Sequence, residues 1–179
     1  VQPQYIEVPN AGLCLLIIWL PRLFNMLSLL TEDGSDLKDT EARVKAIFIL
    51  QRLVTDEPQE YKEQELAFNR ILTGCPFQVP LPKTLKLADY EIMTIESMII
   101  GIKNNCEKFK NISAKGFQLN FIERPGRLEQ REDKWVLYVE GRSYDMLLDF
   151  LPWSYRLVQL PWLEKRINVV WRDKGEFDF

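Results

Sequence analysis

The tripeptide Leu-Pro-Trp occurs twice near the end of this sequence, at residues 151–153 and 160–162. More than any other feature, this pair limits how the chain can fold. Each proline fixes its own φ angle and biases the residue before it toward extended backbone. Each tryptophan brings a large apolar surface and one N–H group that needs a partner when buried. The short, mostly apolar run between the tripeptides is therefore predicted to be a strand with a stiff corner at each end.

These corners supply the candidate site residues: Pro152, Trp153, Pro161 and Trp162, together with Trp171 on the strand expected to follow. We favour the interpretation that they are core anchors of a small sheet. The alternative is that one tryptophan is exposed and anchors a partner protein, because tryptophan is enriched in interface hot spots.

The amino-acid composition indicates the broad class of protein. The chain has 179 residues, of which 46% are hydrophobic and 27% are charged, as expected for a globular protein with room for one domain or two small ones. The formal net charge of -3 offers no basic surface for nucleic acid. The sequence begins with Val1 and shows no signal peptide, so we expect it to be a piece of a longer chain.

Residue types that usually carry chemistry are scarce. There is no histidine, which removes the commonest general base and metal ligand. Cys14, Cys75 and Cys106 have the spacing of neither a disulfide framework nor a zinc site, and they fit a reducing site of synthesis. The sequence also lacks a glycine-rich phosphate loop and a nucleophile elbow. We therefore expect no catalytic residues, no metal and no cofactor.

The carboxylates need separate consideration. A glycosidase-like pair is left open by spacing alone, but most acidic residues fall on polar faces or in turns and are predicted to be solvated surface. Asp145 and Asp149 lie four residues apart on an expected helical turn. They could share a cation, although this spacing is also common on exposed helix faces.

An apolar run from Leu13 to Leu30 is close to the minimum length of a membrane span. It contains Pro21 and Arg22 near its middle, where a charge is costly in a bilayer. We therefore predict a buried helix with a break at Pro21 and no membrane insertion.

Helical periodicity dominates the first two thirds of the chain. A helix is expected from about 39 to 54, with Arg43, Gln51 and Arg52 pointing away from the core, and another from about 59 to 72, stopped by Gly74. Ser113 is predicted to cap a short helix. The clearest element is an apolar stripe at helical spacing over about five turns. Its members are Ile92, Ile95, Ile99, Ile102, Cys106 and Phe109. We favour a core helix over a seam for a coiled-coil partner.

The period changes from 3.6 to 2 after residue 126. Trp135, Leu137 and Val139 alternate with polar residues and predict a hairpin. A short helical turn at 144–150, the strand between the two corners and a last strand through Trp171 follow, and the charged tail at 172–179 is expected to fray. The sequence thus predicts one α+β domain over 1–179. Four to five helices are expected in about 10–123, a mostly antiparallel sheet in about 126–172, and Ile99 and Trp135 in one core.

Several blocks, in order, resemble one known family. They are 10–13 (NAGL) with 20–24 (LPRLF), 42–55 (ARVKAIFILQRLVT), 65–76 (ELAFNRILTGCP), the run from 110 to 128, and the final blocks 135–140, 144–148, both Leu-Pro-Trp corners and 169–171. Together they resemble the tape measure proteins of contractile injection systems, the phage-tail-like particles of bacteria, over about residues 6–171. Phe68, Thr73, Cys75 and Cys106 depart from the family pattern, which changes packing rather than chemistry.

The resemblance implies a structural role. The domain would be the C-terminal region of a longer protein that helps to set tube length during assembly in the bacterial cytoplasm, and it would be part of the particle, inside the tube or at one of its ends. Its partners would be tube, hub or cap proteins or its own copies. The family offers no catalytic residues to transfer. A free-standing adaptor that binds a partner helix through the isoleucine stripe is the alternative, and an enzyme carried by the particle is the reading that we favour least.

Overall fold

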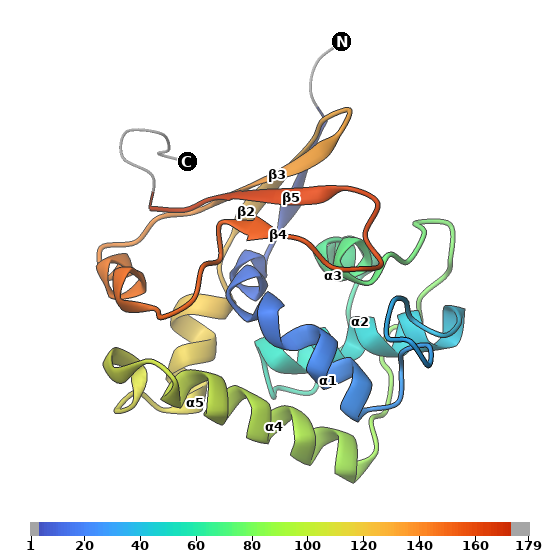
Figure 1. Cartoon of the computed structure of the whole chain (residues 1–179), viewed down its shortest axis with the longest axis horizontal. Helices are drawn as coiled ribbons and strands as arrows, with labels where there is room; N and C mark the ends of the chain where they lie inside the picture. Colours follow the sequence, from blue (N-terminus) through green and yellow to red (C-terminus); the bar gives the residue numbers. More distant parts are fainter. Residues whose placement is uncertain (1–3, 173–179) are drawn as a thin grey trace.

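The computed structural model describes residues 4–172 and has a helical part followed by a five-stranded sheet. Figure 1 shows the strands along one side of the molecule and the helices gathered on the other, with α4 on the side opposite the sheet. The α+β prediction is therefore confirmed. The expectation for the charged tail concerns residues that, apart from Arg172, lie outside the described range.

The apolar run near the beginning folds as two joined helices. A 3₁₀ helix, η1 (Ala11–Trp19), passes directly into α1 (Leu20–Met26), with Pro21 in the first turn of α1, where a proline is tolerated. The change of helix type thus falls next to the proline, as predicted. Gly12 is required because a Cβ there would lie 1.8 Å from the backbone oxygen of Phe121. Of the helices in residues 4–172, none has the length and apolar character needed to cross a membrane.

Helix α2 (Thr40–Val54) begins at Asp39, whose side chain accepts a hydrogen bond from the backbone N–H of Ala42 at 2.7 Å. The next helix is much shorter than predicted. Residues 59–62 have no helical structure, and only a 3₁₀ turn, η2 (Glu63–Leu66), precedes α3 (Ala67–Thr73). The polar stretch before Leu66 has no apolar face to bury and pairs instead with the segment near Lys83, through the backbone N–H of Tyr61. Gly74 ends α3 with a φ of 67°, as expected of a left-handed cap.

The isoleucine stripe is largely core, as predicted. Ile95, Ile99 and Ile102 on α4 (Asp89–Asn104) are buried. The helix stops earlier than its pattern suggested, so Cys106 and Phe109 are buried on the turn that follows, which includes η3 (Glu107–Phe109). Beyond it, α5 (Ala114–Phe117) begins at Ser113, whose hydroxyl caps the N–H of Gly116 at 3.0 Å, and continues into a π-helical turn, η4 (Gln118–Ile122).

The sheet has the strand order β1-β2-β3-β5-β4. Its strands are β1 (Tyr5–Val8), β2 (Gly126–Gln130), β3 (Lys134–Val139), β4 (Leu157–Val158) and β5 (Arg166–Val170). The predicted hairpin is β2–β3, and the lead-in at the N-terminus forms an edge strand against β2. All pairs are antiparallel except β3–β5, which is parallel. A parallel pair needs a long crossover, and here the connection contains η5 (Asp145–Phe150) and the short strand β4.

One hydrophobic core joins the two parts. It contains residues of η1, α1, α2 and α4 together with strand residues such as Leu128, Leu137 and Ile167. Ile99 is buried in it, while Trp135 is only partly buried and packs against it. The prediction that Ile99 and Trp135 contact one core is therefore right, but Trp135 is less buried than predicted.

Candidate functional site

The two Leu-Pro-Trp corners attach the sheet to the helices. The indole N–H of Trp153 donates to the carbonyl of Leu15 in η1 at 2.9 Å, and that of Trp162 donates to the carbonyl of Leu72 in α3 at 2.8 Å. Carbonyls in the last turn of a helix have no partner within the helix, so Leu72 gains one from the sheet side. The predicted strand between the corners is β4, only two residues long.

The five candidate residues have different surroundings. Trp171 and Trp162 are buried, whereas Trp153 is half-buried and lies edge-on against Trp19 with ring centroids 4.4 Å apart. Pro152 and Pro161 are exposed. The structure thus places the indoles of Trp171 and Trp162 inside the domain and leaves part of Trp153 open to solvent.

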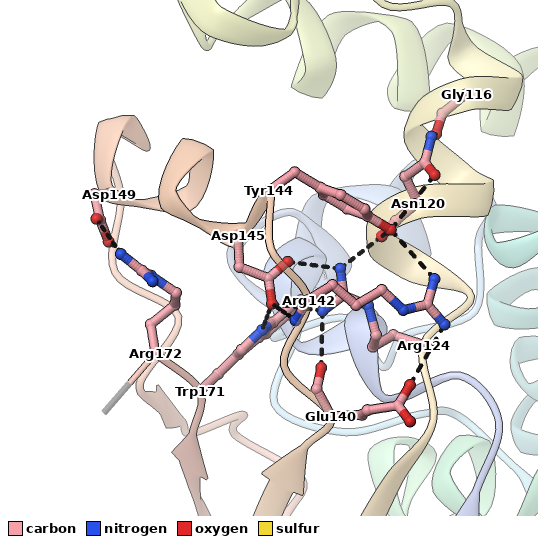
Figure 2. Close-up of polar contacts among 10 residues, drawn as sticks. All are labelled: Gly116, Asn120, Arg124, Glu140, Arg142, Tyr144, Asp145, Asp149, Trp171 and Arg172. Atoms are coloured by element: carbon pink, nitrogen blue, oxygen red, sulfur yellow. Dashed lines mark hydrogen bonds and ion pairs between the residues drawn. The ribbon is translucent and has the colours of Figure 1, made fainter. Parts of the chain in front are cut away.

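A buried ion pair between Arg124 and Asp145 lies next to Trp171. The Arg124 guanidinium makes two hydrogen bonds of 2.7 Å to the two carboxylate oxygens of Asp145, and both side chains are almost fully excluded from solvent. Asp145 also accepts hydrogen bonds from the Trp171 indole at 3.0 Å and from the backbone N–H of Arg142 at 2.8 Å. Figure 2 shows these donors converging on the carboxylate from three segments.

Arg124 is held from several sides. It donates to the carbonyls of Asn120 at 2.7 Å and Glu140 at 2.8 Å, and its guanidinium carbon lies 5.0 Å from the centroid of the Trp171 ring. Its Nε is buried and has no hydrogen-bond partner among the residues that the structure describes. The arginine therefore joins η4, β3 and η5 around one charge.

Electrostatics favour the ionised pair. Burial alone would raise the pKa of Asp145, but hydrogen bonds from Arg124, Trp171 and the Arg142 backbone outweigh it and hold the pKa below its ordinary value. A buried pair of this kind is stable only when its remaining polar groups are also satisfied, as most are here.

The possibility that Asp145 and Asp149 share a cation is not supported by their positions. Asp145 is buried and bound to Arg124, whereas Asp149 is exposed and pairs with Arg172 at 2.7 Å (Figure 2). The hydrogen bond from Arg172 holds the pKa of Asp149 below its usual range. The helical spacing of these aspartates did not reveal that each has its own arginine partner.

A second buried polar cluster joins the first helices. The Asn10 side-chain amide donates to Asn69 at 2.7 Å and to Gln51 at 3.2 Å, and Asn69 donates to the Ile47 carbonyl at 2.9 Å. The cluster fixes the start of η1 against α2 and α3. The expectation that Gln51 points away from the core is wrong, because its amide oxygen is the common acceptor for both asparagines.

Groups that could carry chemistry are dispersed. Within residues 4–172, no set of three or more histidine, cysteine, aspartate or glutamate side chains is placed to hold a metal ion. The thiols of Cys14, Cys75 and Cys106 are all buried, and burial raises the pKa of Cys14 far above the ordinary thiol value. A deeply protonated thiol is a poor nucleophile.

The surface has two main hollows. One, of about 430 Å³, lies between the end of α2 and the extended segments near Pro58 and Leu85. The other, of about 560 Å³, is a groove between α1 and α4. The polar clusters described above are buried, so the surface is where another protein can be contacted.

Together, the fold and these clusters define an α+β domain in which buried polar groups hold distant segments together. Comparison with known families then identifies it: the chain matches the model described as contractile injection system tape measure protein over residues 1–171, and it belongs to that family. The resemblance seen in the sequence over about residues 6–171 is confirmed. No curated protein and no solved structure matches the chain.

Proposed function

We propose that this domain is an anchor of the tape measure protein, a compact end piece that contacts other tail components while tube length is set. The observation that carries the proposal is its shape. The longest helix in the described residues, α4, has 16 residues and spans only about 24 Å. A compact chain of this size has a radius of gyration of roughly 16 Å. A ruler needs length, so we place it in another part of the parent protein.

The proposed partners are tube, hub or cap proteins, or further copies of the chain. Assembly in the bacterial cytoplasm and a final position inside the tube or at one of its ends go with this role. We further propose that the role is structural and not catalytic. This is supported by the buried carboxylate of Asp145, whose oxygens accept hydrogen bonds from Arg124 and Trp171.

The alternative of a free-standing adaptor lacks the open binding surface that it requires. It required the isoleucine stripe to be open for a partner helix, but Ile95, Ile99 and Ile102 are 1–3% exposed and lie in the core of the domain itself. An adaptor role would need a different face.

Deleting the domain from the parent protein tests the anchor proposal. We expect the deletion to stop orderly tail assembly or to release tubes of uncontrolled length, measured by electron microscopy. As a control, the parent protein should be shortened in a helical stretch outside this domain, which should give intact particles with shorter tubes, by about 1.5 Å per residue removed. Normal particles of normal length after deletion of the whole domain would overturn the proposal.

A further inference from the structure

The groove between α1 and α4 is lined mainly by apolar side chains. Its walls include Trp19, Met26, Tyr90, Met93, Met98 and Gly101. Three of these side chains are strongly exposed: Met93 is 67%, Tyr90 62% and Met26 53% accessible. The groove runs along the side of α4 that borders the core, because Ile102, which is buried in the core, lines it beside the exposed Met93 and Gly101.

Methionine is concentrated here. The chain has four methionines, and Met26, Met93 and Met98 all line this groove. Methionine side chains are flexible and polarizable, and they are over-used on surfaces that receive partner helices. Exposed methionines gathered in one hollow therefore favour a binding surface over chance exposure.

Gly101 is a second indication that the groove is a binding surface. It lies inside α4, it has no positive φ, and a Cβ built on it meets no atom within 4 Å. Glycine inside a helix costs about 1 kcal/mol relative to alanine, and nothing within the described protein requires it here. What the glycine does provide is bare backbone on the groove wall, and the distance between two packed helices depends on the side chains at their contact.

The groove carries a positive charge. Among the described residues that line the groove, Arg22 is the single charged one, and none is a carboxylate. Arg22 is exposed and has no hydrogen bond or ion pair with any residue in the range 4–172. Two copies of the chain paired face to face on this groove would bury both Arg22 side chains with no carboxylate from either groove to neutralise them, so charge disfavours a second copy as the occupant.

We propose that the α1–α4 groove binds an amphipathic helix of another tail component. The apolar face of that helix lies against Met26, Met93 and Gly101, and one of its carboxylates pairs with Arg22. A helix laid in a groove between two others is a recurring mode of recognition, with anchors at i, i+3, i+4 and i+7. The inference rests on the proposed anchor function and names the class of partner and the face that receives it.

Site-specific photocrosslinking in assembling cells tests the proposal. Met93 in the full parent protein is replaced by p-benzoylphenylalanine, and the captured segment is sequenced by mass spectrometry. The same replacement at Leu119, an exposed apolar residue outside the groove, is the control. We expect capture from position 93 of a segment with apolar residues at helical spacing and a nearby carboxylate, and no such capture from position 119.

Charge exchange then tests the pairing. Arg22→Glu should lower crosslinking and particle yield by about tenfold, and replacing the partner carboxylate with lysine should restore both. Gly101→Leu should lower both as well, while the melting temperature stays at or above that of the wild type. Because these positions are exposed, a lowered melting temperature is not expected to explain the loss.

Three outcomes would overturn the groove proposal: no capture from position 93, capture of a second copy or of a segment without these features, and unchanged yield in both groove variants. The anchor function fails separately, if particles are normal without the domain. Loss of assembly on deletion together with normal assembly of the groove variants would leave the anchor standing and remove only the groove.

Discussion

Arg124 and Asp145 form a two-pronged ion pair inside the domain, with both oxygens of the carboxylate 2.7 Å from guanidinium nitrogens. The two residues are 21 positions apart and belong to different parts of the fold, the end of the helical part and the crossover between β3 and β5. Trp171, directly after β5, donates to the same carboxylate. One buried charge pair therefore fixes the last strand against the helices.

Removing the negative charge should destabilise the domain strongly. We expect Asp145→Asn to lower the free energy of unfolding by about 3–5 kcal/mol, because Arg124 would remain buried without a counter-charge. Urea denaturation at neutral pH measures the loss. Asp149→Asn is the matched control: its pair with Arg172 is exposed, and the expected loss is under about 1 kcal/mol. Equal effects of the two substitutions would contradict the account.

The pH dependence follows from the lowered pKa of Asp145. A carboxyl group whose folded pKa lies below its unfolded value contributes fully above the unfolded value, about 3.9, and loses that contribution as pH falls through the folded pKa. The stability difference between wild type and Asp145→Asn should therefore be largest near neutral pH and shrink below about pH 4. A difference that stays constant into that acid range would show that the charge of Asp145 is not what stabilises the fold.

The two corner tryptophans should behave differently. Trp162 is buried, so Trp162→Ala should cost about 3–5 kcal/mol of stability. Trp153 is half-buried, and Trp153→Ala should cost less, although the Leu15 carbonyl loses its donor. Thermal melts of both variants, alongside particle assembly, separate core from interface. Assembly lost with Trp153→Ala while the fold stays intact would mark its exposed side as a contact surface.

A substitution at Gly101 is predicted to raise the stability of the domain, whereas the substitutions above lower it. Because its added Cβ would meet open space, Gly101→Ala should stabilise the isolated domain by roughly 0.5–1 kcal/mol. Differential scanning calorimetry measures the gain. A destabilising effect would mean that α4 needs glycine for its own geometry, which would remove one support of the proposed groove.

Local rules predicted much of this fold. Alternation around Leu137 predicted β3, Ser113 predicted a helix start, Gly74 predicted a helix end, and the prolines predicted the corners on either side of β4. Each of these signals depends on residues that are close in sequence, so they can be read without the tertiary structure.

Features that depend on distant partners were missed. The polar side chain of Gln51 suggested an outward position on its helix, but Asn10 and Asn69 approach it from other segments. Asp145 looks like one of many surface acids until Arg124 is placed beside it. The parallel pairing of β3 with β5 likewise depends on how the crossover returns. The groove could have been suspected from Met93 and Gly101 on α4, but only the position of α1 shows that a hollow lies there.

We propose that this domain is a compact end piece and not part of the ruler. Tube length tests it directly when about forty Gly/Ser residues are inserted into the parent protein between Gly34 and Ser35, in a surface loop where such insertions cost little stability. Electron microscopy should then give an unchanged modal tube length, because the insertion only enlarges a surface loop of a folded domain. If the chain instead lies along the tube as a ruler, the insertion should lengthen the tube by about 35 Å or more, and that result would contradict the account.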